Sequence, residues 1–259
     1  MPAADLPLLI EAARIAGRVA TSFTGPTAAR WDKPGDAGPV TEADLAVNDL
    51  LMSNLRAARP AYGWLSEETD DTTERLDHET VFIVDPIDGT RNFVEGGRTW
   101  AISIAVAHKG EITAAAIYLP LRDKMYGAAK GMGATLNQLQ VTVASPSPTR
   151  TATVLAAVTN LEPHHWPGGV PQLTRHYRPS LAYRLSLVGE GRFDGMLTLR
   201  PSWEWDIAAG ALIVSEAGGQ ITDQTGTPLR FNNESPMLNG VVAATKPLHD
   251  NLIWRLTHA

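Results

Sequence analysis

Two amphipathic helical patterns occupy the first sixty residues, and a polar segment separates them. In residues 5–22, apolar side chains recur at every third or fourth position, which predicts a helix. Residues 24–40 are rich in Gly, Pro and charged residues, so we expect an exposed loop there. Thr41 then offers an N-cap with Asp44 three positions later, which predicts a second helix ending before Pro60.

The middle of the chain has the pattern of consecutive β-strands. A short apolar run at residues 81–84 predicts a buried strand. The apolar runs 100–108 and 111–119 are joined by a Lys-Gly pair, so they predict a β-hairpin. Residues 124–129 add one more candidate strand before a glycine-rich turn.

The second half of the chain mixes strands and helices without strict alternation. Prolines interrupt the apolar pattern near residue 145, so we expect two subdomains, 1–145 and 146–259. The elements expected beyond this boundary are strands at 154–158, 195–199 and 240–244, helices at 180–189 and 206–217, and a C-terminal helix. This order is typical of a layered α+β fold rather than a doubly wound sheet.

Composition excludes several classes of function. The chain has 259 residues and a formal net charge of −6, and no basic run could follow a nucleic-acid backbone. It has no cysteine, which excludes disulfides, thiolate metal sites and cysteine nucleophiles. No apolar run approaches the ~20 residues of a membrane helix, and the first residues do not resemble a signal peptide. We therefore expect a cytoplasmic protein that binds neither a membrane nor a nucleic-acid polymer.

Carboxylates stand beside loop-forming residues at four places, namely Asp44, Glu67 with Glu68, Asp85 with Asp88, and Asp206. Asp85 leaves the predicted buried strand, and the proline and glycine that follow allow a sharp turn. Such a turn can direct Asp85, Asp88 and the carbonyl of Ile87 at one point. An all-oxygen cluster of this kind suits a hard cation such as Mg²⁺.

The residues after this turn suggest an anion site. If a helix starts at Gly89-Thr90, its first backbone N–H groups can bind phosphate. Each carboxylate also has an ordinary structural explanation when taken singly. The aspartates of the turn could cap backbone groups, Glu67-Glu68 could be a solvated turn, and Asp206 could cap the helix behind it. The metal interpretation therefore depends on the whole set.

The chain resembles the inositol monophosphatase superfamily of metal-dependent, lithium-sensitive phosphatases. Residues 85–93, Asp-Pro-Ile-Asp-Gly-Thr-Arg-Asn-Phe, match that family's central motif, and residues 205–210 match its second motif. Residues 66–69 match the acidic pair, residues 39–44 the helix start, and residues 115–137 the pattern that follows. The resemblance implies a layered α-β-α-β-α sandwich, a homodimer and a small phosphorylated substrate.

The resemblance also implies two or three Mg²⁺ ions held by particular residues. Asp85 would bridge two metals. Glu67 and the carbonyl of Ile87 would complete the first metal site, and Asp88 and Asp206 would complete the second.

The remaining roles implied by the resemblance concern water and phosphate. Thr90, paired with Asp44, would orient the attacking water held near Glu67 and help to deprotonate it. The N–H groups of Gly89 and Thr90 would hold the phosphate. Lys33 would lie on a loop that closes over the site and tunes a weaker third metal.

Two other interpretations of the acidic turn remain open at this point. Haloacid-dehalogenase phosphatases use an Asp-x-Asp-Gly-Thr loop and an aspartyl-phosphate intermediate. There the acidic residues are two apart, whereas Asp85 and Asp88 are three apart with Pro86 between them, which argues against the covalent route. A catalytically inert member acting as a metal- or phosphate-binding regulator is the other alternative.

The substrate is less clear from the sequence. Leu199 stands where inositol-specific members have a glutamate, whereas the Arg-Pro and Glu-Trp-Asp pattern of residues 200–206 resembles 3′(2′),5′-bisphosphate nucleotidases. Arg184 or Arg200 would then contact a second phosphate, and Trp203 would stack on adenine. Salt bridges for the arginines and core packing for Trp203 are the alternatives. Inositol 1-phosphate, histidinol phosphate and sugar bisphosphates are the competing substrates.

Overall fold

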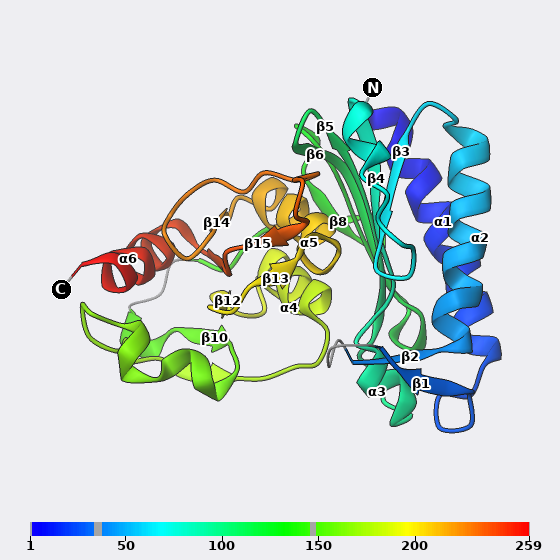
Figure 1. Cartoon of the computed structure of the whole chain (residues 1–259). Helices are drawn as coiled ribbons and strands as arrows, with labels where there is room; N and C mark the ends of the chain where they lie inside the picture. Colours follow the sequence, from blue (N-terminus) through cyan, green and yellow to red (C-terminus); the bar gives the residue numbers. More distant parts are fainter. Residues whose placement is uncertain (1, 34–37, 146–148, 259) are drawn as a thin grey trace.

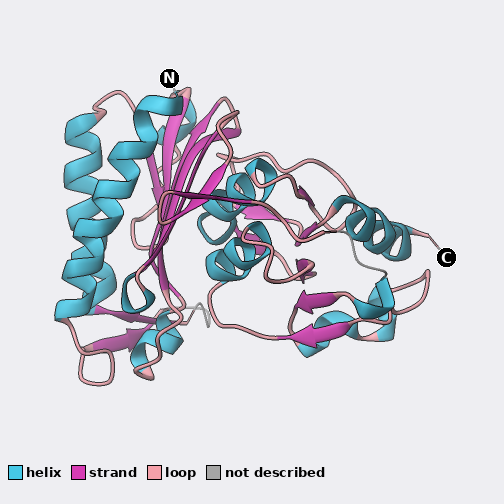
Figure 2. Cartoon of the chain, turned by 180° about the vertical axis from the view of Figure 1, so that it is seen from behind, coloured by secondary structure: helices cyan, strands magenta, loops and turns pink. Residues whose placement is uncertain are grey.

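Helices and sheets alternate in five layers (Figure 1) in the computed structural model, which describes residues 2–33, 38–145 and 149–258. Helices α1 (Pro2–Ser22) and α2 (Glu42–Ala58) form the first layer, and a seven-stranded sheet forms the second. Helices α4 (Leu181–Gly189) and α5 (Glu204–Glu216) form the third. A five-stranded sheet and helix α6 (Lys246–Thr257) complete the stack, which Figure 2 shows from behind. The predicted α-β-α-β-α sandwich is confirmed.

The larger sheet contains the strands predicted from the middle of the chain. Its order is β3-β4-β5-β6-β7-β8-β9, with β3 parallel to β4 and the other neighbours antiparallel. The strands are β3 (Gly63–Ser66), β4 (Thr80–Asp88), β5 (Ala101–His108), β6 (Glu111–Leu119), β7 (Lys124–Ala129), β8 (Ala134–Leu136) and β9 (Leu139–Val141). Helices cover both faces, so β4 to β7 are buried along nearly their whole length. The predicted hairpin is β5–β6.

The smaller sheet combines strands from the last part of the chain in the order β11-β10-β12-β16-β14. These are β10 (Thr153–Leu155), β11 (Thr174–His176), β12 (Gly195–Thr198), β14 (Gln220–Thr222) and β16 (Val241–Ala244), beside a short pair, β13 (Ser202–Trp203) with β15 (Met237–Leu238). The strand predicted at 154–158 ends at Leu155, because residues from Val158 onward form a 3-10 turn. Strands β11, β13, β14 and β15 were not predicted.

Short helical turns connect these elements. The α-helix α3 (Thr90–Val94) directly follows β4. The 3-10 turns are η2 (Glu74–Asp77), η3 (Pro120–Arg122), η4 (Thr149–Thr151), η5 (Val158–Leu161) and η6 (Pro163–His165). Among the described residues, none of the helices combines the length and apolar character that crossing a bilayer requires.

One prediction in the first sixty residues is wrong. Residues 24–40 were expected to form only an exposed loop, but β1 (Arg30–Asp32) pairs antiparallel with β2 (Pro39–Thr41). The proline is tolerated because it occupies the first residue of an edge strand, where its missing N–H breaks no ladder. Residues 34–37, between the two strands, lie outside the described residues.

The apolar core has one part on each side of the larger sheet. Side chains of α1 and α2, including Leu9 and Leu51, pack on one face of that sheet. On the other face, α4 and α5 pack against both sheets, so Ile83 of the larger sheet and Ala243 of the smaller one belong to one cluster. The predicted subdomain boundary stays a prediction, and it falls beside residues 146–148, which the structure does not describe.

We expect Leu51→Ala to lower the free energy of unfolding by about 2–5 kcal/mol, because Leu51 is fully buried between α2 and the sheet. Leu45→Ala, at a partly exposed position of the same helix, should cost only about 0.5 kcal/mol. Urea unfolding followed by circular dichroism measures both values. Equal losses would contradict this assignment of the buried face.

Candidate active site

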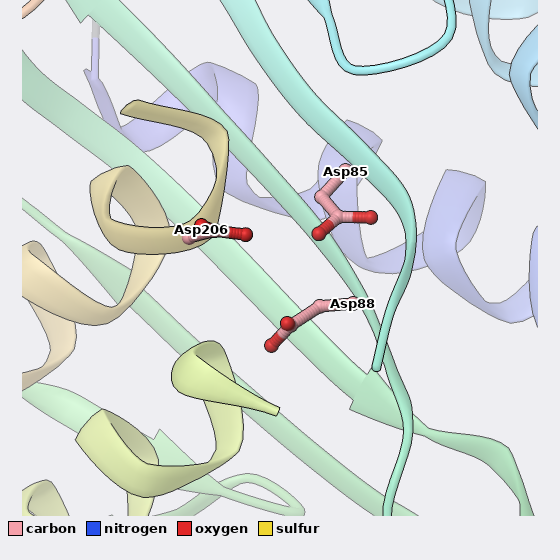
Figure 3. Close-up of side chains that lie close together, drawn as sticks. All are labelled: Asp85, Asp88 and Asp206. Atoms are coloured by element: carbon pink, nitrogen blue, oxygen red, sulfur yellow. The ribbon is translucent and has the colours of Figure 1, made fainter. Parts of the chain in front are cut away.

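The carboxylates of Asp85, Asp88 and Asp206 converge on one point (Figure 3). One oxygen atom from each lies within 4.8 Å of the other two. Asp85 and Asp88 belong to the C-terminal end of β4, whereas Asp206 projects from the first turn of α5. The structure therefore brings together three aspartates that the sequence analysis grouped, from two different layers of the fold.

A bulge in β4 allows Asp85 and Asp88 to face the same side. Side chains alternate along a strand, so residues three positions apart would normally point to opposite faces. Here Asp85 pairs with Ser103 and Asp88 with Ala101, so β4 contains one more residue than the facing part of β5. An extra residue of this kind reverses the alternation. Gly89 then ends the strand with a φ of 97°, which favours glycine.

The parallel pairing of β3 and β4 brings the acidic pair to the same edge. Ser66 lies opposite Val84, and the N–H of Glu67 donates to the carbonyl of Val84 at 3.2 Å. Glu67 therefore emerges beside Asp85, although it is not part of the tight group of three. Burial and then the charge of Glu67 are the largest influences that raise the pKa of Asp85.

Asp85 has a carboxylate in an electrostatically unfavourable position. It is 1% exposed, and neither of its carboxylate oxygens has a hydrogen-bond partner among the described residues. Burial and the charges of four neighbouring carboxylates raise its pKa well above the usual range. An unpaired buried carboxylate is costly, and a bound cation would offset that cost. The residues present therefore fit a metal ion.

Asp206 is not the N-cap residue of its helix, although its carboxylate accepts a hydrogen bond from the backbone N–H of Trp203. Helix α5 begins at Glu204, and Trp203 occupies the N-cap position without a side-chain cap. Asp206 therefore lies in the first turn, where the helix dipole favours a negative charge. Burial and then the charges of Asp88 and Glu67 nevertheless raise its pKa well above the usual range. Its position suits a cation ligand better than a cap.

The N-terminus of α4 holds Asp88, a contact that the sequence analysis missed. The hydroxyl of Ser180 donates to Asp88 Oδ2 at 2.5 Å, and the N–H of Ala182 donates to the same atom at 2.7 Å. The N–H of Leu181 reaches Oδ1 at 3.3 Å. Burial raises the pKa of Asp88 to about 6, against the opposing effect of these donors. Ser180 could be identified as an N-cap from its residue type, but nothing local indicates its partner.

Ser180 also has an unusual backbone conformation. Its φ is 68° and its ψ is 114°, and its hydroxyl accepts a hydrogen bond from the N–H of Tyr183 as the cap of α4. A positive φ at a non-glycine residue stores strain that the surroundings must balance. The bonds to Asp88 and to the helix are the interactions that hold Ser180 in this conformation.

Thr90 and Asp44 are paired, as the family resemblance implied. The hydroxyl of Thr90 lies 3.1 Å from Asp44 Oδ1 and 3.1 Å from the carbonyl oxygen of Ile87. Asp44 Oδ2 accepts hydrogen bonds from the N–H and the hydroxyl of Thr41, at 2.9 Å and 2.5 Å, in the predicted capping box. The cap therefore fixes Asp44 and leaves Oδ1 facing Thr90. Burial raises the pKa of Asp44 to about 6.

Lys33 forms ion pairs with both glutamates of the acidic pair, Glu67 and Glu68. Its Nζ lies 2.8 Å from Glu67 Oε1 and 2.6 Å from Glu68 Oε1. Burial and then the charge of Glu67 raise the pKa of Glu68 to about 7, while Lys33 opposes that shift. Burial disfavours the charge of Lys33, but the two glutamates outweigh it and raise the pKa of Lys33. The ammonium group of Lys33 therefore neutralises negative charge on these two carboxylates.

The salt bridges that were the alternative to substrate binding are not formed by the two predicted arginines. In the part of the chain that the structure describes, Arg184 and Arg200 take part in no ion pair. Arg184 is buried, and its Nε donates a hydrogen bond to the carbonyl of Arg178. The Cζ atom of its guanidinium lies 4.4 Å from the centroid of the Tyr177 ring. Arg200 is exposed.

Trp203 is not a core residue. It is 39% exposed and stacks on the ring of Trp205 with centroids 4.7 Å apart and an interplanar angle of 10°. It lies immediately before α5, three positions from Asp206. Its indole therefore presents an aromatic surface to solvent near the start of the helix that carries Asp206.

Comparison with known proteins identifies the family. Residues 4–259 match the sequence model of the inositol monophosphatase family. The chain belongs to this family. It is 32% identical over 264 residues to an inositol-1-monophosphatase of Mesorhizobium japonicum, which covers 94% of the chain and 97% of that relative. It is also 32% identical to the Nus factor SuhB of Escherichia coli K12, covering 93% of the chain and 91% of that protein.

Solved structures agree with this assignment. The extragenic suppressor protein SuhB of Bartonella henselae is similar with a TM-score of 0.82 and 29% identity, covering 98% of both chains. The IMPase of Thermotoga maritima has a TM-score of 0.82 and 26% identity, covering 97% of this chain and 96% of that one. The family is metal-dependent and acts on small phosphorylated substrates. The chain is therefore a phosphoric monoester hydrolase rather than an inert regulator.

We expect a divalent cation to raise the melting temperature of the wild-type protein, because it would neutralise the buried cluster around Asp85. At one hundred times the dissociation constant, the stabilisation is about 2.7 kcal/mol. Asp85→Asn should lose most of this increment, whereas Asp49→Asn, an equal charge change on the exposed face of α2, should keep it. Thermal scans with and without MgCl₂ measure the difference. An undiminished increment in Asp85→Asn would contradict the metal interpretation.

Proposed function

We propose that this phosphatase hydrolyses a 3′(2′),5′-bisphosphate nucleotide, such as adenosine 3′,5′-bisphosphate, to AMP and phosphate with Mg²⁺. Asp85, Asp88, Asp206, Glu67 and the carbonyl of Ile87 would hold two ions, and Lys33 would adjust a weaker third. The observation that carries the choice of substrate is the pair Arg184 and Arg200. Both lack carboxylate partners among the described residues, and both act electrostatically on the aspartate cluster.

The oxygen-only donor set supports Mg²⁺. Carboxylates and a backbone carbonyl are ligands that Mg²⁺ accepts, with water and phosphate oxygens in its other positions. When bound, the ions would neutralise charge on the phosphate and lower the pKa of bound water toward neutral pH. The oxygens of Asp85 would help to hold the ions, because no donor among the described residues competes for them.

Thr90 and Asp44 would handle the proton of the attacking water. The oxygen of the Thr90 hydroxyl can accept a hydrogen bond from the water, while the hydroxyl hydrogen is donated to Asp44 Oδ1. Because Thr41 fixes Asp44, the direction of this relay is set before the substrate binds. Glu67 would hold the same water from the other side. Attack would then proceed in line at phosphorus, without a covalent aspartyl intermediate.

The first amides of α3 would bind the phosphate. Helix α3 begins at Thr90, and the first N–H groups of a helix have no partner inside it. Gly89 has its φ in the left-handed region and no side chain, so the phosphate can approach its backbone closely. Phosphate oxygens would thus lie between these N–H groups and the cations.

A second phosphate would lie at the arginines. Burial is the largest influence on Arg184 and lowers its pKa, while the charge of Asp88 raises that pKa and the charge of Arg200 lowers it. Two guanidinium groups without a carboxylate partner repel each other, and a bound anion would offset that repulsion. The exposed face of Trp203 would stack on the adenine beside them.

Inositol 1-phosphate is the second candidate substrate. It is favoured by relatives named inositol-1-monophosphatase in Mesorhizobium japonicum and in Caulobacter vibrioides, at 32% and 33% identity. The apolar and buried Leu199 argues against it, because this side chain cannot bind a sugar hydroxyl. A homodimer, inhibition by lithium and a cytoplasmic location are further proposals that rest on the family resemblance alone.

We expect Thr90→Val to lower kcat by about 10²–10⁴-fold, the usual contribution of a positioned proton acceptor. Thr90→Ser keeps the hydroxyl and should retain most of the activity. Phosphate release at saturating MgCl₂ and substrate measures both variants. Wild-type kcat in Thr90→Val would contradict the proposed relay.

We expect the highest kcat/KM on adenosine 3′,5′-bisphosphate when it is assayed in parallel with inositol 1-phosphate, histidinol phosphate and fructose 1,6-bisphosphate. Arg200→Met should raise the KM for the nucleotide by about tenfold or more, because it removes a charge-assisted hydrogen bond. The KM for inositol 1-phosphate should stay unchanged. Arg56→Met, at an exposed position of α2, is the matched control. Equal rates on all four substrates would contradict the proposed specificity.

A further inference from the structure

A second carboxylate of α5 is buried close to the proposed metal site. Glu204, the first residue of α5, is 0% exposed and lies two positions before Asp206. Its Oε2 accepts a hydrogen bond from the N–H of Asn232 at 2.6 Å. Its Oε1 accepts from the N–H of Asn233 at 2.9 Å and from Asn233 Nδ2 at 2.6 Å. Glu204 therefore fixes the segment 232–233 onto the N-terminus of α5.

Arg75 connects the same segment to the residues that follow Glu67. Arg75 is 3% exposed, and its Nη1 donates to Asn232 Oδ1 at 2.7 Å. Its Nε and Nη2 bind the two carboxylate oxygens of Asp71 at 2.9 Å and 2.7 Å. Asp71 lies four positions after Glu67. We call this chain of contacts, Glu204–Asn232–Arg75–Asp71, the carboxylate strap.

The strap spans two elements that electrostatics would push apart. The charge of Glu67 is among the influences that raise the pKa of Asp206, so these two carboxylates repel each other. Glu67 follows β3, whereas Asp206 lies in α5, and no hydrogen bond in the described structure joins the two side chains directly. The strap links the Glu67 segment to α5 through partly buried, charge-assisted hydrogen bonds, which are the stronger kind.

We infer that the carboxylate strap positions Asp206 relative to Glu67, so that both reach a divalent cation without a further rearrangement. This inference rests on the proposed metal site. Glu204 and Arg75 are positioning residues, because neither belongs to the proposed ligands or contacts the reacting phosphate. The strap would act through the backbone, because it holds the segments that carry the two ligands, and residues that orient metal ligands tune metal affinity.

Two variants cut the strap at different places. Glu204→Gln replaces an acceptor oxygen with an NH₂ group that faces the N–H groups of segment 232–233. Asn232→Gly removes the side-chain contacts of Asn232 with Arg75, yet it keeps the backbone N–H that Glu204 binds and the hydrogen bond from Arg75 to the carbonyl of Glu234. Asn232 has a φ of 61°, which glycine adopts without strain, so this variant should fold even if Glu204→Gln does not.

Glu216 offers a matched control on the same helix. Its carboxylate accepts hydrogen bonds from the N–H groups of Gly131 and Gly133, both at 2.8 Å. Like Glu204, it fixes a loop onto α5, but it does so at the opposite end, away from Asp206. Glu216→Gln therefore reproduces the loss of a loop contact without touching the strap.

The test is Mg²⁺ binding by isothermal titration calorimetry without substrate, together with the Mg²⁺ activation constant and the KM for substrate. We expect Glu204→Gln and Asn232→Gly to weaken Mg²⁺ binding by about tenfold or more, in the range known for partners of metal ligands. Glu216→Gln should bind Mg²⁺ like the wild type, even if its melting temperature falls.

The outcomes separate the two hypotheses. If Asn232→Gly, and Glu204→Gln where it folds, bind Mg²⁺ as Glu216→Gln does, the strap has only a structural role and the inference is overturned. If the wild-type protein binds no Mg²⁺, the proposed metal site fails first and the strap fails with it. A rise in the substrate KM at saturating Mg²⁺, with unchanged Mg²⁺ affinity, would also overturn the inference.

Discussion

The mutual repulsion of buried carboxylates is the constraint on which the rest of this structure depends. Asp85 is buried from solvent, its oxygens have no hydrogen-bond donor in the part of the chain that the structure describes, and its neighbours carry the same charge. The other acidic groups are each restrained by a donor: Asp88 by the start of α4, Asp44 by its capping box, Glu67 by Lys33 and Asp206 by the backbone N–H of Trp203. Within the described part of this cluster, the oxygens of Asp85 stay free of such donors and can bind a cation.

The five layers make this arrangement possible. The larger sheet delivers Asp85 and Asp88 at the end of β4, and the parallel strand β3 delivers Glu67 at the same edge. Helices α4 and α5 lie between the two sheets, so their N-termini can both face that edge (Figure 1). The dipoles of these helices favour negative charge at their N-termini and offset part of the repulsion.

Local signals in the sequence predicted more than long-range ones did. The capping box at Thr41, the hairpin of β5 and β6 and the turn after Asp85 all depend on residues close together in the chain, and the structure contains each of them. The contact of Ser180 with Asp88 has no local signature, because each residue type has a common structural role of its own. The strands β1 and β2 were missed because each has only three residues, too few to show an alternating pattern.

The dependence of Asp88 on Ser180 has a consequence for how the protein is made. The two residues are 92 positions apart, so β4 leaves the ribosome well before α4 exists. A nascent chain at that stage contains a partial acidic cluster whose third aspartate and whose supporting donors have not yet been synthesised. Domains usually fold as units during synthesis. Catalytic competence would therefore arise late and in one step, when α4 and α5 dock on the finished sheet.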